Sequence, residues 1–195
     1  MTDHPSPMAP DEPPVEPPAI PRGRVPSRVL VHTGDGKGKT SAAMGIVMRA
    51  VARGWRVAVF QFVKDDRWRT GEETSARNLG VDWWAIGDGF TWDSTDLDRT
   101  EAIARAAWDA ARAAIGAGEH ELVVLDEVTY PINWGWIAIE EVVAAIGGRP
   151  SHVNVVATGR DAPPALCDLA DTVTEMASRK HAFDQGVGAM RGIEF

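Results

Sequence analysis

The feature that most constrains the fold of this chain is a glycine-rich stretch, VHTGDGKGKT, at residues 31–40. It follows an apolar run, RVLVHT, and precedes a segment in which apolar residues recur at helical spacing. The run predicts a buried strand, and the spacing predicts an amphipathic helix that ends near Gly54. A strand, a glycine-rich turn and a helix in this order gather backbone N–H groups around one point, which favours phosphate binding.

The residue types inside this stretch suit contact with phosphate. Its glycines permit positive φ angles and let the backbone approach oxygen atoms closely. Lys39 supplies a mobile positive charge, and the Thr40 hydroxyl can ligate Mg²⁺. The general pattern G-x-x-x-x-G-K-[ST] would begin at position 33, where the chain has Thr33, so the first glycine comes one residue late. This departure indicates a specialised branch of the P-loop proteins. The predicted nucleotide contacts are Gly34, Asp35, Gly36, Lys37, Gly38, Lys39, Thr40 and Ser41.

Further apolar runs along the chain predict more strands. RVAVFQFV (56–63), ELVVLDE (121–127) and VNVVAT (153–158) do not alternate with polar residues, which is typical of parallel strands covered on both faces. A long amphipathic stretch at residues 94–118 predicts a helix between two of them. We therefore expect an α/β protein, a three-layer α/β/α fold of the P-loop NTPase type with a mostly parallel sheet.

Two acidic residues follow one predicted strand. In LVVLDE, four apolar residues run into Asp126 and Glu127 at the carboxyl end of the strand, where the ligands of such sheets collect. A carboxylate there can hold Mg²⁺ in the same pocket as Thr40. The sequence therefore predicts a site for Mg²⁺ (or Mn²⁺) made by Thr40, Asp126 and Glu127, and ATP or a close relative as the ligand.

The beginning of the chain differs in composition from the rest. Nine of the thirteen prolines lie at or before Pro26. Such a segment lacks backbone donors and has too little apolar surface to offset the entropy of ordering it. We expect residues 1–26 to form a disordered proline-rich tail and residues 27–195 to form one domain.

Charge and cysteine content exclude several function classes. The net charge of -8 argues against a nucleic-acid-binding protein, which would need lysine and arginine massed on one face. The single cysteine excludes an internal disulfide framework and fits a reducing cytosol. No run of about 18 apolar residues predicts a membrane span, and no segment resembles a signal peptide. We expect a cytoplasmic protein with no nucleic-acid or membrane partner.

Besides the glycine-rich stretch, the chain contains the motifs QFVK, GDGFTWDST, VVLDEVTYPINWGW, ATGRDAPPALCDLADTVTEM and KHAFDQGVGAMRGIEF. With these motifs, residues 29–195 closely resemble the corrinoid adenosyltransferases of the P-loop type. The resemblance implies transfer of the 5′-deoxyadenosyl group of ATP to the cobalt(I) of a reduced corrinoid, cob(I)alamin or a precursor such as cob(I)yrinic acid a,c-diamide, with release of triphosphate. It also implies that ATP lies reversed relative to ordinary P-loop hydrolases, a homodimer, and an electron donor such as reduced flavodoxin or flavin.

The resemblance also implies roles for individual residues. Phe90 and Trp92, in GDGFTWDST, would close against the lower face of the corrin ring and displace the axial base of the cobalt. Arg49 and Arg160 would contact the nucleotide. The catalytic residues would be Lys39, which brings positive charge to the triphosphate leaving group, and Thr40 and Glu127, which would hold Mg²⁺ beside it.

Two other function classes remain open from the residues alone. A P-loop ATPase or nucleoside kinase would release ADP, because water or a hydroxyl group would attack a phosphorus atom. A carrier of corrinoid or nucleotide would bind without turnover. The motifs GFTW and KHAFDQGVGAMRGIEF have no role in a kinase, and an intact set of Lys39, Thr40 and Glu127 argues against a carrier.

Overall fold

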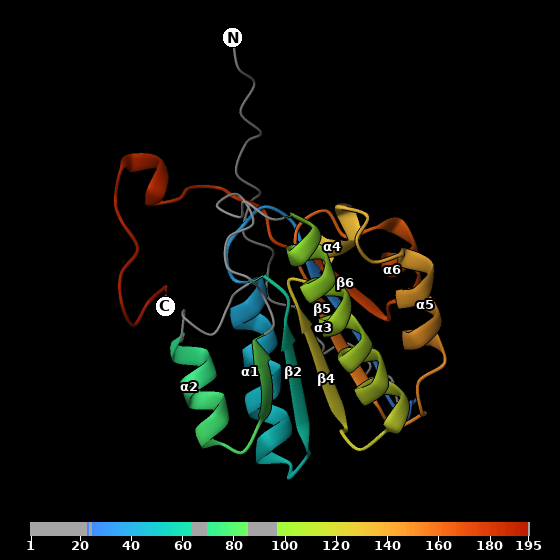
Figure 1. Ribbon diagram of the computed structural model, residues 1–195. Helices are drawn as coiled ribbons and strands as arrows, with labels where there is room; N and C mark the ends of the chain where they lie inside the picture. The colour runs from blue at the N-terminus through green and yellow to red at the C-terminus, as the bar shows by residue number, and fades with distance from the viewer. Residues whose placement is uncertain (1–22, 24, 64–69, 86–96, 195) are drawn as a thin grey trace, which may run out of the picture.

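The computed structural model describes residues 23, 25–63, 70–85 and 97–194 (Figure 1). Strands and helices alternate along most of this part of the chain. In order, the elements are β1 (Val29–Thr33), α1 (Lys39–Ala52), β2 (Val57–Gln61), α2 (Gly71–Asn78), β3 (Asp82–Ala85), α3 (Leu97–Ala117), β4 (Leu122–Asp126), α4 (Thr129–Asn133), α5 (Ile139–Gly147), β5 (Asn154–Thr158), α6 (Pro164–Leu169), β6 (Thr172–Glu175) and the 3₁₀ turn η2 (Phe183–Gln185).

The described strands form one six-stranded sheet in the order β3-β2-β4-β5-β1-β6. Every strand pair in it is parallel, so the predicted α/β fold with a mostly parallel sheet is confirmed. Because all strands point the same way, the loops that follow β1, β4 and β5 meet at one edge of the sheet. That edge is where the predicted nucleotide residues lie.

Helices cover both faces of the sheet, as Figure 1 shows. Within β4, Val123 and Leu125 pack into a core shared with α3, α5 and α6, whereas Leu122 and Val124 pack into a second core shared with α1 and α2. Side chains of a strand alternate between its faces, so an unbroken apolar run is buried only where both faces are covered. The non-alternating runs of the sequence therefore correspond to the central strands.

The sequence analysis did not predict the two edge strands, β3 and β6. β3 and β6 have four residues each, and β6 is exposed along its whole length. A short edge strand does not need the continuous apolar run that marks a central one. The predicted helix end at Gly54 is confirmed, since Gly54 has φ 78° and its N–H donates to the carbonyl of Val51.

The described residues include only a small part of the predicted N-terminal tail. Of the predicted tail, residues 1–26, only Gly23, Val25 and Pro26 are described, and its disorder stays a prediction. Among the described residues, no helix is both long enough and apolar enough to cross a membrane.

Asp171 links the start of β1 to the start of β6. Its Oδ2 accepts a hydrogen bond from the Val29 N–H (2.8 Å), and its Oδ1 accepts one from Arg28 (3.4 Å). The bond from the Val29 N–H holds the pKa of the Asp171 carboxyl below its usual range, and Arg28 acts in the same direction.

We predict that Asp171→Ala lowers the free energy of unfolding by about 1 kcal/mol near neutral pH, measured by urea denaturation. Because the folded-state pKa is lowered, this contribution is present above the usual aspartate pKa and is lost as the pH falls through the folded-state pKa. Asp171→Asn keeps an acceptor and should lose less stability. A difference between wild type and Asp171→Ala that stays constant down to strongly acidic pH would contradict this role.

Candidate functional site

The glycine-rich loop joins β1 to the N-terminus of α1. Gly34 has φ 91° and Gly38 has φ 106°, conformations that side chains rarely adopt. Gly38 is also the N-cap residue of α1, and no side chain caps that end of the helix. The first N–H groups of a 14-residue helix are therefore left to a ligand, and the helix dipole favours an anion there. This confirms the predicted strand, turn and helix.

The loop is fixed from outside by the chain that follows β6. The Gly36 N–H donates to the carbonyl oxygen of Met176 at 2.6 Å. A Cβ atom added at Gly34 or at Gly36 would lie 2.6 Å from the same oxygen. These two positions therefore require glycine because another backbone passes against the loop.

Lys39 lies inside the turn of the loop. Its ammonium group donates to the carbonyl oxygens of Gly34 (2.6 Å) and Gly36 (2.7 Å). Burial lowers the pKa of Lys39 below its usual value, and Arg160 acts in the same direction, partly opposed by Glu127 and Asp35. The Lys39 ammonium is thus influenced by charged groups from three loops, those that follow β1 (Asp35), β4 (Glu127) and β5 (Arg160).

Asp126 is the centre of a buried hydrogen-bond network. Its Oδ1 accepts from the hydroxyl of Thr40 (2.9 Å) and from the hydroxyl of Thr158 (2.7 Å). Its Oδ2 accepts from the Nε2 of Gln61 (3.0 Å), and the Asp126 side chain is fully buried. The network joins α1, β2, β4 and β5, and it brings together Thr40 and Asp126, two of the three predicted metal ligands.

Glu127 follows directly and has a strained backbone. Its φ is 63°, which is unusual for a residue with a side chain. The Thr158 hydroxyl accepts a hydrogen bond from the Glu127 N–H at 2.9 Å. Strain of this kind costs about 1–3 kcal/mol and tends to occur at functional sites. Glu127 is near enough to Lys39 to influence its pKa, so the structure brings this predicted residue to the loop.

Arg160 comes from the loop after β5. Its guanidinium lies 3.9 Å from the carboxylate of Asp35, and both side chains are largely exposed. The Thr33 hydroxyl accepts from the Ala162 N–H at 3.1 Å. The residue that departs from the general P-loop pattern therefore ties the end of β1 to the loop that carries Arg160.

One predicted residue, Arg49, lies away from this point, and two others cannot be placed. Arg49 is exposed and lies ten residues beyond Lys39 on α1, about 15 Å along the helix axis. Phe90 and Trp92 lie outside the described residues. Their predicted roles stay predictions.

Several important groups were missed by sequence reasoning. Gln61 and Thr158 lie inside or at the end of apolar runs, and both are buried in the structure. A polar residue within such a run is the sequence signal that could have identified them, because a buried polar group needs a partner. The Met176 carbonyl carried no signal, because a backbone oxygen can be placed only by the fold.

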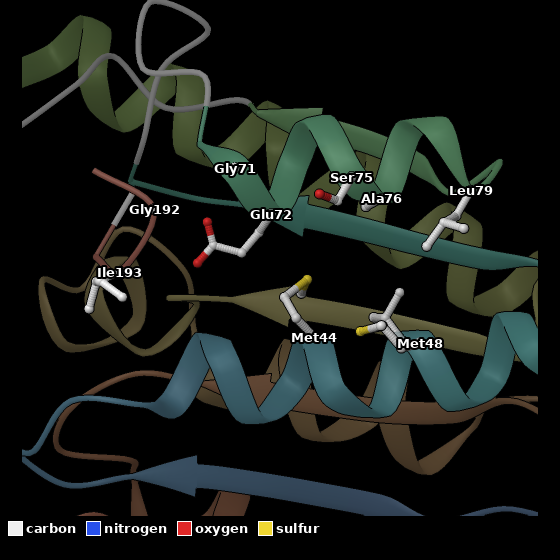
Figure 2. Close-up of a pocket in the computed structure, with 10 residues that line it drawn as sticks. Met44, Met48, Gly71, Glu72, Ser75, Ala76, Leu79, Gly192 and Ile193 are labelled. Atoms are coloured by element: carbon white, nitrogen blue, oxygen red, sulfur yellow. The ribbon is translucent and has the colours of Figure 1, made fainter. Parts of the chain in front are cut away.

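A separate groove of about 440 Å³ lies between α1 and α2 (Figure 2). Apolar side chains of Met44, Met48 and Leu79 line it, together with Ile193 near the end of the chain. Glu72 adds a negative charge at one end. An apolar groove with an acidic group does not suit a polyphosphate, so this groove does not compete with the glycine-rich loop as the predicted nucleotide site.

The residues around Asp126 have donor chemistry that fits Mg²⁺. Hydroxyl and carboxylate oxygens are the ligands this ion prefers, and it commonly keeps waters and substrate phosphate oxygens in its shell. In the described part of the chain, no group of three or more His, Cys, Asp or Glu side chains could hold a metal by itself. A magnesium ion here would therefore depend on the phosphates of the nucleotide.

Comparisons with known proteins cover almost all of the described chain. Residues 26–195 match the family described as ATP:corrinoid adenosyltransferase BtuR/CobO/CobP. The corrinoid adenosyltransferase of Pseudomonas aeruginosa is 44% identical over 169 residues, covering 86% of this chain and 83% of that protein. The corrinoid adenosyltransferase CobA of Salmonella typhimurium is 40% identical over 167 residues, covering 86% and 85%.

We predict that Gly36→Ala weakens the binding of MgATP at least about tenfold, because the new Cβ would displace the loop from the Met176 carbonyl. Equilibrium dialysis measures the affinity. The matched control is Gly45→Ala on α1, where an added Cβ meets nothing within 4 Å and ATP affinity should be unchanged. Wild-type affinity in Gly36→Ala would contradict the structure of the loop.

We also predict that Thr158→Val lowers the free energy of unfolding by about 2 kcal/mol, because the Asp126 carboxylate and the Glu127 N–H each lose a buried partner. Thermal and urea denaturation measure this loss. Thr174→Val on the exposed strand β6 is the same change outside the network and should alter stability by less than about 0.5 kcal/mol. Equal effects of the two changes would exclude a special role for the network.

Proposed function

The chain belongs to the ATP:corrinoid adenosyltransferase family BtuR/CobO/CobP, and we propose that it transfers the 5′-deoxyadenosyl group of ATP to the cobalt of a reduced corrinoid. The observation that carries this proposal is the family match over residues 26–195, which includes an intact phosphate loop with Lys39 and Thr40 in place. ATP and a corrinoid are then the two substrates.

The reaction is a displacement at carbon. Cobalt(I) donates an electron pair to C5′ of the ribose, the bond between C5′ and O5′ breaks, and its electron pair leaves with the triphosphate. Cobalt(I) carries no proton, so no general base is required. What the protein must stabilise is the negative charge that develops on the leaving oxygen.

We assign that stabilisation to the glycine-rich loop and Lys39. The N–H groups at the start of α1 have no side-chain cap, the Lys39 ammonium lies in the turn of the same loop, and the Gly36 N–H holds that loop to the Met176 carbonyl. Donors that need no reorganisation stabilise a transition state best. We further propose that the loop residues Gly34, Asp35, Gly36, Lys37 and Gly38, with Ser41 at the start of α1, make up the binding site for the phosphates of ATP.

A magnesium ion would be held by the Thr40 hydroxyl with Asp126 and Glu127, directly or through water. When bound, it would neutralise negative charge on the triphosphate. Asp126 holds the Thr40 hydroxyl in place, and Thr158 holds the N–H of Glu127. Arg160 and Arg49 are proposed nucleotide contacts, of which Arg160 lies near Asp35 in the loop.

The remaining parts of the proposal rest on the sequence. Phe90 and Trp92 are proposed to contact the lower face of the corrinoid, and both lie outside the described residues. We further propose an electron donor such as reduced flavodoxin or flavin and a cytoplasmic location, because the cobalt(I) substrate requires reducing conditions. We also propose a homodimer, which the family resemblance implies.

The reaction is tested by incubating the protein anaerobically with ATP, Mg²⁺ and chemically reduced cob(I)alamin. The corrinoid spectrum should become that of light-sensitive adenosylcobalamin, and the phosphate product should be triphosphate. Release of ADP without a change at cobalt would overturn the proposal in favour of an ATPase or kinase.

In the same assay, we predict that Lys39→Ala slows turnover by about 100-fold or more, because it removes a donor aimed at the leaving group. Arg112→Ala, which removes an exposed charge on α3 paired with Asp109, is the control and should keep the wild-type rate. Wild-type turnover in Lys39→Ala would exclude the assigned role.

A further inference from the structure

Three aromatic side chains form a continuous cluster on α4 and the turn after it. The rings of Tyr130 and Trp134 have centroids 5.6 Å apart and are tilted by 33°. The rings of Trp134 and Trp136 have centroids 4.6 Å apart and are tilted by 57°. We call Tyr130, Trp134 and Trp136 the aromatic wall.

The aromatic wall presents apolar surface to solvent. Trp134 is 38% exposed, and Tyr130 and Trp136 are only partly buried. By contrast, Trp83 and Trp108 are almost completely buried in the two cores. Large aromatic groups gathered at a surface mark contact sites more often than scattered ones do.

Hydrogen bonds hold the backbone that carries the wall. Backbone hydrogen bonds join the Trp134 N–H to Tyr130 and the Trp136 N–H to Pro131, both at 2.9 Å. Arg105 on α3 donates to the carbonyl of Trp136 at 3.5 Å. A surface fixed in this way loses little conformational entropy when a ligand binds it.

The wall also adjoins the phosphate site. The carboxylate of Glu127 and the guanidinium of Arg160 lie near enough to influence both the Tyr130 hydroxyl and the Lys39 ammonium. The side-chain amide of Asn133, on the same helix, donates to the carbonyls of Arg160 (3.4 Å) and Asp161 (3.1 Å). Helix α4, which carries Tyr130, therefore follows the turn of Glu127 directly and is hydrogen-bonded to the loop of Arg160.

We propose that the aromatic wall binds the corrinoid, with Trp134 and Trp136 packing against the macrocycle beside the triphosphate. This inference rests on the proposed adenosyl transfer, which requires the cobalt to reach the ribose of a nucleotide held at the glycine-rich loop. The rings are tilted, so they form a broad uneven surface and not a parallel slot for one flat base. Such a surface suits a wide, puckered macrocycle, and the indole N–H groups can donate to its peripheral amides.

The test measures corrinoid binding without turnover. Cob(II)alamin is dialysed anaerobically against the protein in the presence of MgATP, and MgATP binding is measured separately. Trp134→Ala and Trp136→Ala should each raise the Kd for cob(II)alamin about tenfold and leave the Kd for MgATP within about twofold of wild type. Trp55→Ala is the control, because Trp55 is 40% exposed but lies at the opposite edge of the sheet, before β2.

The variants Trp134→Phe and Trp136→Phe retain an aromatic ring and should recover most of the affinity, which covers the case in which an alanine variant fails to fold. Unchanged cob(II)alamin affinity in all folded variants would overturn the inference, as would a loss confined to MgATP, which would assign the wall to adenine. If wild type forms adenosylcobalamin while the variants bind normally, the inference fails and the proposed function stands. If wild type neither binds nor adenosylates the corrinoid, both fail.

Discussion

The site depends above all on one buried carboxylate. Asp126 is fully buried, and it accepts hydrogen bonds from Thr40, Thr158 and Gln61. A buried carboxylate is tolerated only where donors surround it, and these three bonds link α1, β2 and β5 to the end of β4. The hydroxyl that would face a metal ion and the strained backbone of Glu127 are both positioned by these bonds.

A second constraint acts from the edge of the sheet. β6 is short and exposed, yet the carbonyl of Met176 just beyond it fixes the glycine-rich loop through Gly36. The shape of the loop is therefore supported by a contact within the protein, and the Lys39 ammonium lies in the turn. Preorganisation of this kind matters in a reaction whose main demand is stabilising a leaving group. The chain just after an exposed edge strand thus supports the predicted phosphate loop.

The arrangement of the site agrees with a displacement that moves no proton. Its conspicuous groups are positive charges, backbone donors and oxygen ligands, and the helix that carries part of the aromatic wall is hydrogen-bonded through Asn133 to the loop of Arg160. In the proposed arrangement, the glycine-rich loop binds the triphosphate and the aromatic wall binds the macrocycle. The two substrates would then touch where these two surfaces meet. The apolar groove between α1 and α2 lies apart from this boundary, lined by Met44, Met48 and Leu79.

The sequence by itself determined the layered α/β fold, the phosphate loop and the family, because each of them is recognised from patterns of neighbouring residues. Buried parallel strands require unbroken apolar runs, and a phosphate loop requires glycines and a lysine at fixed spacing. Only the tertiary structure decided that Gln61 and Thr158 support Asp126, that a carbonyl after β6 fixes the loop, and that Tyr130 stands beside Lys39's charged neighbours. These contacts join residues distant in the chain, and their positions follow from the order of strands in the sheet, which no local pattern encodes.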